Sequence, residues 1–327
     1  MKTIIIKFGG SSLADPGKIR RAAAMVLAAL RRGLRPVAVV SAPADTTDDL
    51  LALAAETGGE KRSSREGDAL LAAGEQFSAA LMAMAIDAEG GRAVSLTGAQ
   101  AGILTDDNFS AAAILAVDAG RLKRELRAGR IPVVAGFQGA TRSGDTTTLG
   151  RGGSDFTAVA LARALGSELC EFRTDVKGIY TAHPAVVPEA RKIRRLTYAE
   201  VITLARLGTE VRQLRAVEYA GRHGIALHLR SSFHDEQGTL VSSAVPGSGV
   251  SCLSSMKDGD SVLVSAIGRG LGREHAAAAL TAAGAGAAAV RRSAGAVTLR
   301  LPAANAEAAL KSLHKVFFGG RRAAARR

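Results

Sequence analysis

The chain has 327 residues, 47% hydrophobic and 22% charged, which is long enough for two domains and a sizeable aliphatic core. Its formal net charge is +13, but aromatic residues make up only 4% and no nucleic-acid motif is present, which argues against a nucleic-acid partner and leaves an acidic small molecule compatible. Two cysteines are too few for a disulfide framework, and no signal peptide or uninterrupted apolar run of ~20 residues is visible, so we expect a cytoplasmic protein without membrane contact.

The chain opens with a continuous β-branched run over residues 3–7, which is typical of a buried parallel strand. Lys7 ends this run, and Phe8-Gly9-Gly10-Ser11-Ser12 follows. Backbone N–H groups of the glycines can approach phosphate oxygens while the lysine supplies a positive charge. The alternative is a strand-ending turn with a solvated lysine, because no Walker A string is present.

A helix over 18–32 and a strand over 36–40 come next, and the hydroxyl-rich loop 41–47 leads into a helix that begins at Asp48. Strands that end in polar loops and lead into helices are typical of an α/β fold, in which sites gather at the carboxyl ends of the strands. A further helix over 70–87 carries Glu75 between apolar positions. Its carboxylate either points into a pocket and binds an ammonium group or lies on a solvated face.

A strand over 131–137 precedes the most glycine-dense stretch, Leu149-Gly150-Arg151-Gly152-Gly153-Ser154-Asp155, and an apolar helix follows at once. A glycine turn that opens a helix directs N–H groups and partial positive charge at an anion. Arg151 can bind a carboxylate in bidentate fashion, and Asp155 can hold a lysine or a magnesium ion. The alternative is an ordinary Gly/Ser loop capped by Asp155.

The strand over 168–173 leads into a loop with two candidate nucleotide contacts. Asp175 is a candidate for the ribose or base, and Tyr180 for stacking on a purine. A helix over 198–206, a helix from Ala216 and a strand over 225–230 complete this part of the chain.

The Ser/Gly/Pro-rich segment 241–257 predicts a linker. After it, a strand, a helix, two strands and a helix over 258–318 indicate a small ferredoxin-like α+β module. The basic tail 319–327 is predicted to be disordered.

Taken together, the motifs resemble those of the aspartate kinases of the amino-acid kinase superfamily, in the same order and spacing. The resemblance covers about residues 2–240 and implies an α/β three-layer sandwich with a mostly parallel central sheet for 1–240, followed by a single ACT-like regulatory or dimerisation module. The motifs that carry it are Lys7-Phe8-Gly9-Gly10-Ser11-Ser12, Val40-Ser41-Ala42, Thr46-Thr47-Asp48, Gly74-Glu75, Thr97-Gly98-Ala99-Gln100-Ala101-Gly102, Thr148 to Asp155, Thr174-Asp175-Val176 and Arg230-Ser231-Ser232-Phe233.

The resemblance implies ATP- and Mg²⁺-dependent phosphorylation of the β-carboxylate of L-aspartate, by a homo-oligomer such as a dimer. The catalytic residues it implies are Lys7, Asp155 and Gly10. The residues implied to bind the amino acid are Ser41, Thr47, Glu75, Arg151 and Ser154. Those implied to bind the nucleotide are Lys7, Gly9, Gly10, Ser11, Thr174, Asp175 and Tyr180, and no metal site is built from protein ligands alone.

The chain departs from the family pattern on the nucleotide side, where Lys177, His183, Ala185 and Glu210 replace Asp, Asp, Arg and Lys. Two alternatives therefore stay open. One is an enzyme of the same fold that acts on another amino or carboxylic acid. The other is a non-catalytic regulatory homologue.

Overall fold

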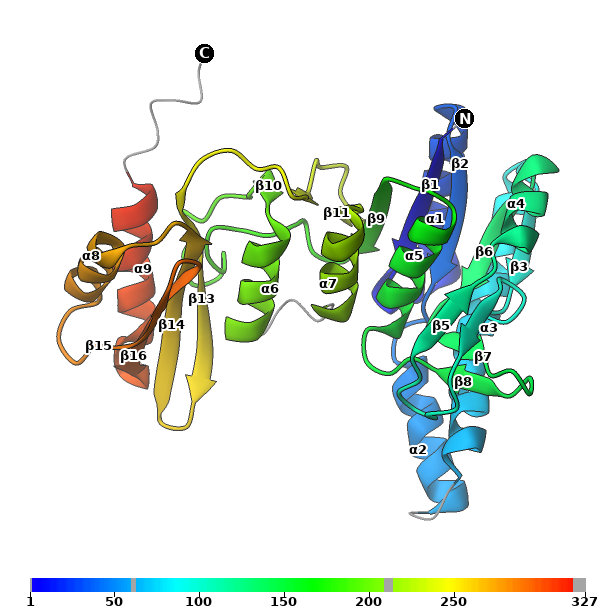
Figure 1. Cartoon of the computed structure of the whole chain (residues 1–327), viewed down its shortest axis with the longest axis horizontal. Helices are drawn as coiled ribbons and strands as arrows, with labels where there is room; N and C mark the ends of the chain where they lie inside the picture. The colour runs from blue at the N-terminus through cyan, green and yellow to red at the C-terminus, as the bar shows by residue number, and fades with distance from the viewer. Residues whose placement is uncertain (1, 60–62, 209–213, 320–327) are drawn as a thin grey trace. The chain divides into compact units, whose positions relative to one another are not determined.

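The computed structural model of the chain describes residues 2–59, 63–208 and 214–319. Its internal contacts divide the chain into two compact units that interleave in sequence (Figure 1). The first consists of Met1–Lys177 and Glu218–Gln237, and the second of Gly178–Val217 and Gly238–Arg327. The sequence predicts a single boundary at residue 240, whereas each of the two units consists of two separate chain segments. The assignment of a catalytic domain and a regulatory module to parts of the chain stays a prediction.

A mostly parallel sheet forms the centre of the first unit, as the sequence predicts. Its strand order is β11-β9-β1-β2-β6-β3, and every neighbouring pair in this series is parallel. The strands are β1 (Thr3–Phe8), β2 (Arg35–Val40), β3 (Ala93–Leu96), β6 (Ile131–Ala135), β9 (Leu169–Thr174) and β11 (Ala226–Ser231).

Helices cover both faces of this sheet, which makes the predicted three-layer sandwich. Helices α1 (Pro16–Arg31) and α3 (Ser64–Ala88) share a core cluster with the side chains of Ile4, Ile6 and Phe8 from β1. Because successive side chains of a strand point to opposite faces, Ile5 and Lys7 face the other layer. There α5 (Gly153–Ala164) packs against β1, β2 and β9.

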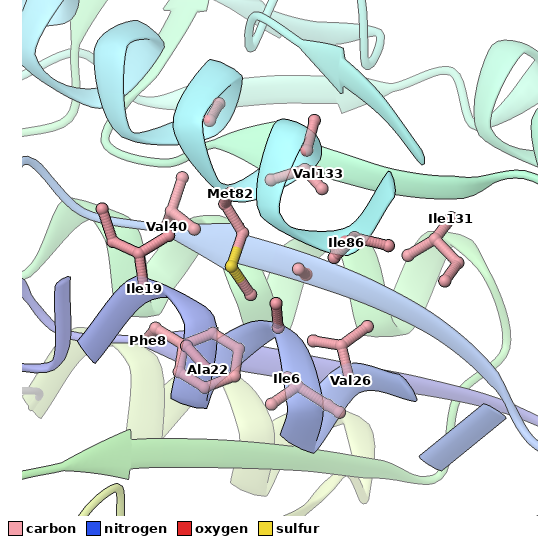
Figure 2. Close-up of a cluster of buried hydrophobic side chains, with 14 of the residues drawn as sticks. Ile6, Phe8, Ile19, Ala22, Val26, Val40, Met82, Ile86, Ile131 and Val133 are labelled. Carbon is pink, nitrogen blue, oxygen red and sulfur yellow. The ribbon is translucent and has the colours of Figure 1, made fainter. Parts of the chain in front are cut away.

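Helix α3 is long and apolar enough to cross a bilayer by length and composition alone. In the structure, however, it is a core helix. Its Ala79, Met82 and Ile86 lie in the cluster between α1 and the sheet, and Figure 2 shows Met82 extending from α3 toward the residues of α1 and the strands.

A second, four-stranded sheet of the first unit is not predicted by the sequence. Its order is β5-β4-β7-β8, with strands of only three or four residues: β4 (Ile103–Thr105), β5 (Ile114–Val117), β7 (Gln138–Ala140) and β8 (Thr146–Thr148). The predicted strand over 131–137 ends at Ala135 because Phe137 adopts a φ of 67°. The short hairpin β7–β8 then delivers Thr148 to the start of the glycine-dense stretch.

The second unit holds an antiparallel sheet of order β13-β14-β16-β15, packed against α8 and α9. The prediction of a linker over 241–257 is wrong from Gly249 onward, because these residues pair with β14 as strand β13. Two of the serines that suggested a linker are bonded to a preceding helix: Ser251 Oγ donates to Glu200, and Ser254 Oγ to the Leu207 carbonyl at 2.9 Å. The elements are β13 (Gly249–Asp258), β14 (Ser261–Arg269), α8 (Arg273–Ala283), β15 (Ala288–Ser293), β16 (Ala296–Pro302) and α9 (Ala306–Phe318).

Strand β13 also changes the topology expected for a ferredoxin-like module, which ends in a strand. In the described part of the chain, which ends at Gly319, no strand follows α9, and β13 forms the outer strand beside β14 instead. The predicted disordered tail falls on residues 320–327, outside the described residues. The remaining elements are η1 (Gly10–Leu13), α2 (Thr46–Gly58), α4 (Gly120–Arg127), β10 (Arg195–Leu196), α6 (Tyr198–Leu207), α7 (Leu214–His223), β12 (Thr239–Val241) and η2 (Ala303–Asn305).

Two methionines of α3 test the packing of this core. Met82 is fully buried, whereas Met84 is 66% exposed. We expect Met82→Ala to lower the free energy of unfolding by about 2–5 kcal/mol, because it leaves a cavity in a close-packed interior. Met84→Ala on the same helix should change it by less than about 0.5 kcal/mol. Urea unfolding of both variants measures the difference, and equal losses would contradict this description of the core.

Candidate functional site

A buried ion pair lies at the carboxyl end of β1. Lys7 Nζ is 2.8 Å from Asp155 Oδ1, and both side chains are less than a tenth exposed. Alternation along β1 turns Lys7 toward α5, and Asp155 lies in the first turn of that helix. Asp155 thus holds a lysine, one of the two partners expected for it, and the alternative of a solvated Lys7 is wrong.

The two glycines after β1 make different contacts in the structure. A Cβ on Gly10 would lie 2.6 Å from the Ala42 carbonyl oxygen, so only glycine lets this turn pack on the loop that follows β2. The same contact includes a hydrogen bond from the Ala44 N–H to the Gly10 carbonyl at 3.0 Å. A Cβ on Gly9 would lie 3.8 Å from Lys7 Nζ, which places Gly9 beside the lysine amine. The glycines therefore build a tight turn next to a buried cation.

The two serines of this turn differ in exposure. Ser11 is exposed, whereas Ser12 is buried and its Oγ lies 2.7 Å from Ser232 Oγ in the loop after β11. The role of Ser12 and Ser232 in joining the two loops is absent from the sequence-based site, although both serines belong to the motifs that carry the resemblance. Only the parallel order β11-β9-β1 brings them together.

Glu75 is buried, so the alternative that its carboxylate lies on a solvated helix face is wrong. Its Oε1 accepts a hydrogen bond from the Ala42 N–H at 3.1 Å, and Oε2 has no hydrogen-bond partner among the described residues. Helix α3 comes this close because residue 74 is glycine, where a Cβ would lie 3.0 Å from Ala42 Cβ. Burial raises the pKa of Glu75 to about 7, while the Ala42 N–H and the charge of Lys7 act in the opposite direction. One carboxylate oxygen is thus left available to a cationic group.

The glycine-dense stretch forms a left-handed turn that opens α5. Gly150 and Gly152 have φ values of 72° and 73°, which favour glycine. Gly152 is the N-cap and has no side chain that could cap the helix, whereas Asp155 lies in the first turn and its carboxylate pairs with Lys7. The first N–H groups of a helix lack intrahelical partners and suit an anion. Arg151 is exposed at this turn, whereas Ser154 is buried against Gly136.

The remaining residues assigned to the amino-acid side lie near the carboxyl end of β2. Ser41 directly follows β2, and its N–H donates to the Phe8 carbonyl at 3.2 Å, which ties this loop to the end of β1. Thr47 lies in the first turn of α2. Both are partly exposed.

On the nucleotide side, Thr174 ends β9 and Asp175 is exposed directly after it. Lys177 forms an ion pair with Glu236, whose Oε1 lies 3.4 Å from the lysine Nζ. Tyr180 belongs to the second unit, where Lys192 Nζ lies 5.9 Å from the centroid of its ring.

Of the other departures from the family pattern, His183 accepts a hydrogen bond from the Ala185 N–H at 3.2 Å within the second unit. Glu210 and the nearby Arg212 lie outside the described residues.

Strained backbone surrounds the site. Ala44, Ser110 and Phe137 have φ values of 43°, 70° and 67°, in the region that favours glycine. Such strain costs on the order of 1–3 kcal/mol per residue and persists only where neighbouring contacts enforce it. The sequence carries no signal for it, because none of the three is glycine or asparagine.

A metal site made of protein ligands alone is not formed by the described residues, which contain no group of three or more His, Cys, Asp or Glu side chains suited to one. The single carboxylate of Asp155, next to a lysine and a helix N-terminus, fits Mg²⁺ that is held mainly by phosphate oxygens and water.

Comparison with known proteins places this fold in a class. The chain belongs to the amino acid kinase family, whose model matches residues 2–231. Among curated relatives, it is 50% identical over 242 residues to an aspartokinase of Mycobacterium tuberculosis, covering 74% of this chain and 57% of that protein. It is 47% identical over 245 residues to an aspartokinase of Geobacillus stearothermophilus, covering 75% and 60%. The chain thus spans about three fifths of the length of these relatives.

Solved structures of the same fold include an aspartate kinase from Synechocystis, with a TM-score of 0.68 and 28% identity over 96% of this chain and 69% of that one. Aspartokinase III of E. coli, in complex with aspartate and ADP, has a TM-score of 0.80 and covers 97% of this chain and 100% of that one. At 22% identity, this second likeness concerns the fold alone.

The buried pair makes a stability prediction. Asp155→Ala should lower the free energy of unfolding by about 3–5 kcal/mol, because it leaves the Lys7 amine buried without a counter-charge. Adding Lys7→Met should recover most of that loss, and urea unfolding of both variants measures it. Glu168→Ala is the control, since it breaks the exposed Lys2–Glu168 pair at the other end of the same sheet region. It should cost no more than about 1 kcal/mol. Equal effects of Asp155→Ala and Glu168→Ala would contradict the burial of the pair.

Proposed function

We propose that this chain transfers the γ-phosphoryl group of ATP to the β-carboxylate of L-aspartate and forms 4-phospho-L-aspartate. The observation that carries the proposal is the buried Lys7–Asp155 pair within electrostatic reach of the buried carboxylate of Glu75. The site therefore combines a cation for a transferring phosphoryl group with an anion for an ammonium group. Aspartokinases that are about half identical over three quarters of the chain support the choice of substrate.

Phosphoryl transfer requires little covalent work from the protein, which must hold two polyanions in line and neutralise developing charge. Lys7 is the residue that stabilises charge at the transferring phosphoryl group, and Asp155 holds its amine in place. The backbone N–H of Gly10 and the exposed hydroxyl of Ser11 supply donors to the phosphates, and Gly9, whose own N–H donates to the Arg173 carbonyl at 3.1 Å, holds this turn beside the lysine amine. Mg²⁺, carried with ATP, neutralises phosphate charge beside Asp155.

The amino acid is read by groups of opposite charge. Arg151 binds the α-carboxylate, since a guanidinium matches two carboxylate oxygens. Glu75 binds the α-ammonium group through Oε2, which has no hydrogen-bond partner within the described part of the chain. Ser41, Thr47 and Ser154 complete this side, and Thr174 and Asp175 of the first unit hold the nucleotide.

The altered nucleotide side favours one competing function, a non-catalytic homologue that binds the amino acid. Here Lys177, which stands where the family pattern has an acidic residue, is paired with Glu236. Incubation with ATP, Mg²⁺ and each of several amino and carboxylic acids, with hydroxylamine to trap an acyl phosphate, separates the possibilities. Formation of aspartyl hydroxamate supports our proposal. A hydroxamate of another acid instead would show a kinase with a different substrate. No hydroxamate with any of the acids would favour the non-catalytic homologue.

The assembly and location are part of the same proposal. We propose a homo-oligomer, such as a dimer, and a cytoplasmic location, because the reaction consumes ATP. Sedimentation of the purified chain over a range of concentrations tests the oligomer.

Variants of the charged residues should separate binding from chemistry. Charged hydrogen bonds contribute about 1.5–3 kcal/mol each, so Arg151→Ala and Glu75→Ala should raise the aspartate KM at least about tenfold and leave the ATP KM nearly unchanged. Lys7→Ala should instead lower kcat far more than it raises either KM, because its interaction strengthens as charge develops. A normal aspartate KM in both Arg151→Ala and Glu75→Ala would remove these residues from the site.

Aspartate binding should also depend on pH through Glu75. Only the ionised carboxylate binds an ammonium group, and the pKa of Glu75 in the free protein is raised to about 7. Below pH 7 the protein must release a proton to bind, so the aspartate Kd should rise about tenfold per pH unit as the pH falls. Calorimetric titrations between about pH 5.5 and 8.5 measure this slope. Glu75→Gln should bind weakly with a flat profile, and an unchanged slope in that variant would assign the titration to another group.

A further inference from the structure

Asp68 is a buried carboxylate that the proposed chemistry does not use. It lies on α3 with 1% of its surface exposed, and three donors meet it. The Thr148 N–H donates to Oδ2 at 2.7 Å, and the Thr148 hydroxyl donates to Oδ1 at 2.7 Å. The Ser110 N–H is shared between Oδ1 and Oδ2, at 3.0 and 2.9 Å.

These donors belong to the two loops that build the glycine-dense turn. Thr148 ends β8, three positions before Arg151, and its carbonyl accepts a hydrogen bond from the Ala112 N–H at 2.9 Å. Ser110 has a φ of 70°, and its carbonyl oxygen would lie 3.2 Å from a Cβ on Gly150. Asp68 therefore holds a strained residue and the entry to the Arg151 turn through the same carboxylate.

The same helix carries Glu75, seven residues further along and on the same face. At 1.5 Å per residue, the two carboxylates are separated by about 10 Å along a rigid helix. A second link supports this arrangement, since Gln138 of β7 donates to the Ala72 carbonyl at 2.9 Å and accepts from Gln76 at 3.2 Å. Strands β7 and β8 pair with each other and β8 packs on α3 (Figure 1), so the hairpin is fixed to the helix at both strands.

Burial of a carboxylate is costly, and no ion pair compensates Asp68 in the described residues. An ionised carboxylate accepts several short hydrogen bonds at once, from both sides, and no neutral side chain of this size offers as many acceptor positions. The charge thus fixes the loop more tightly than a neutral group can.

We propose that Asp68 is a positioning residue for amino-acid binding. It fixes the Arg151 turn to α3 and so sets the separation between Arg151 and Glu75, the two groups that read the α-carboxylate and α-ammonium of the substrate. This inference rests on the proposed function for the identity of the substrate. The hold of Asp68 on the turn rests on the structure alone.

The test compares Asp68→Asn with Thr148→Val, Thr148→Ser and the control Glu125→Gln. Asp68→Asn keeps the volume but presents an NH₂ group to one of the donors, and Thr148→Val removes only the hydroxyl bond. We expect each to raise the aspartate KM at least about tenfold while the ATP KM stays within about twofold. Thr148→Ser keeps the hydroxyl and should restore the parent value.

Glu125 is an equally buried carboxylate of the first unit, 3% exposed and bound by Arg121 and Arg130. Glu125→Gln should lower the melting temperature without a change in aspartate KM. This control distinguishes a general loss of stability from a displacement of the Arg151 turn, because only the second should raise the aspartate KM.

Trypsin supplies a readout that needs no substrate. Arg151 is exposed, and we expect cleavage between Arg151 and Gly152, followed by mass spectrometry, to be at least about fivefold faster in Asp68→Asn than in the parent and in Glu125→Gln.

The outcomes separate this inference from the proposed function. A parent that forms no aspartyl hydroxamate removes the proposed function, and the cleavage rate still decides whether Asp68 holds the turn. A folded Asp68→Asn variant with parental aspartate KM and parental cleavage overturns the inference. Should Asp68→Asn fail to fold, Thr148→Val decides in its place, and parental values for that variant overturn the inference equally.

Discussion

The ion pair between Lys7 and Asp155 is the interaction on which the rest of the site depends. Two opposite charges removed from water are stable only when each keeps the other at contact distance. That requirement fixes the carboxyl end of β1 against the first turn of α5. It explains how β1, which is buried on both faces, can carry a lysine one residue before its end. The partial positive charge of the helix N-terminus and the lysine amine then face the same region.

Helix α3 provides the second constraint, because one rigid element serves both the core and the site. Its apolar side chains fill the space between α1 and the sheet. They are the reason that the helix is apolar enough to resemble a membrane span. Toward its N-terminus, the buried side of the same helix carries Asp68, Gly74 and Glu75, which meet the glycine-dense turn and the loop after β2. Packing of the core therefore sets the position of two buried carboxylates, and a shift of the helix would move both loops together.

The second unit shows how local composition misleads. Serines and glycines over 241–257 read as a linker, yet β13 forms there because its serine hydroxyls find acceptors on α6 and its alternate residues Val250 and Cys252 are buried. A serine is compatible with a strand wherever a neighbouring element accepts its hydrogen bond. That element is helix α6, which lies more than 40 residues before β13, as the contact between Ser254 and Leu207 shows. The local sequence around the serines therefore gives no sign of their acceptors.

The sequence by itself determined the alternation of strands and helices, the parallel sheet and the positions of the glycine turns, because periodicity and glycine content are local properties of the chain. It also indicated that Asp155 could hold a lysine or a magnesium ion, and that Glu75 had a choice between a pocket and solvent. Tertiary structure alone decided that choice, the pairing of Asp155 with Lys7, the hold of Asp68 on Thr148, and the strained φ of Ser110. Burial and the identity of a partner depend on residues distant in the chain, so local patterns carry no information about them.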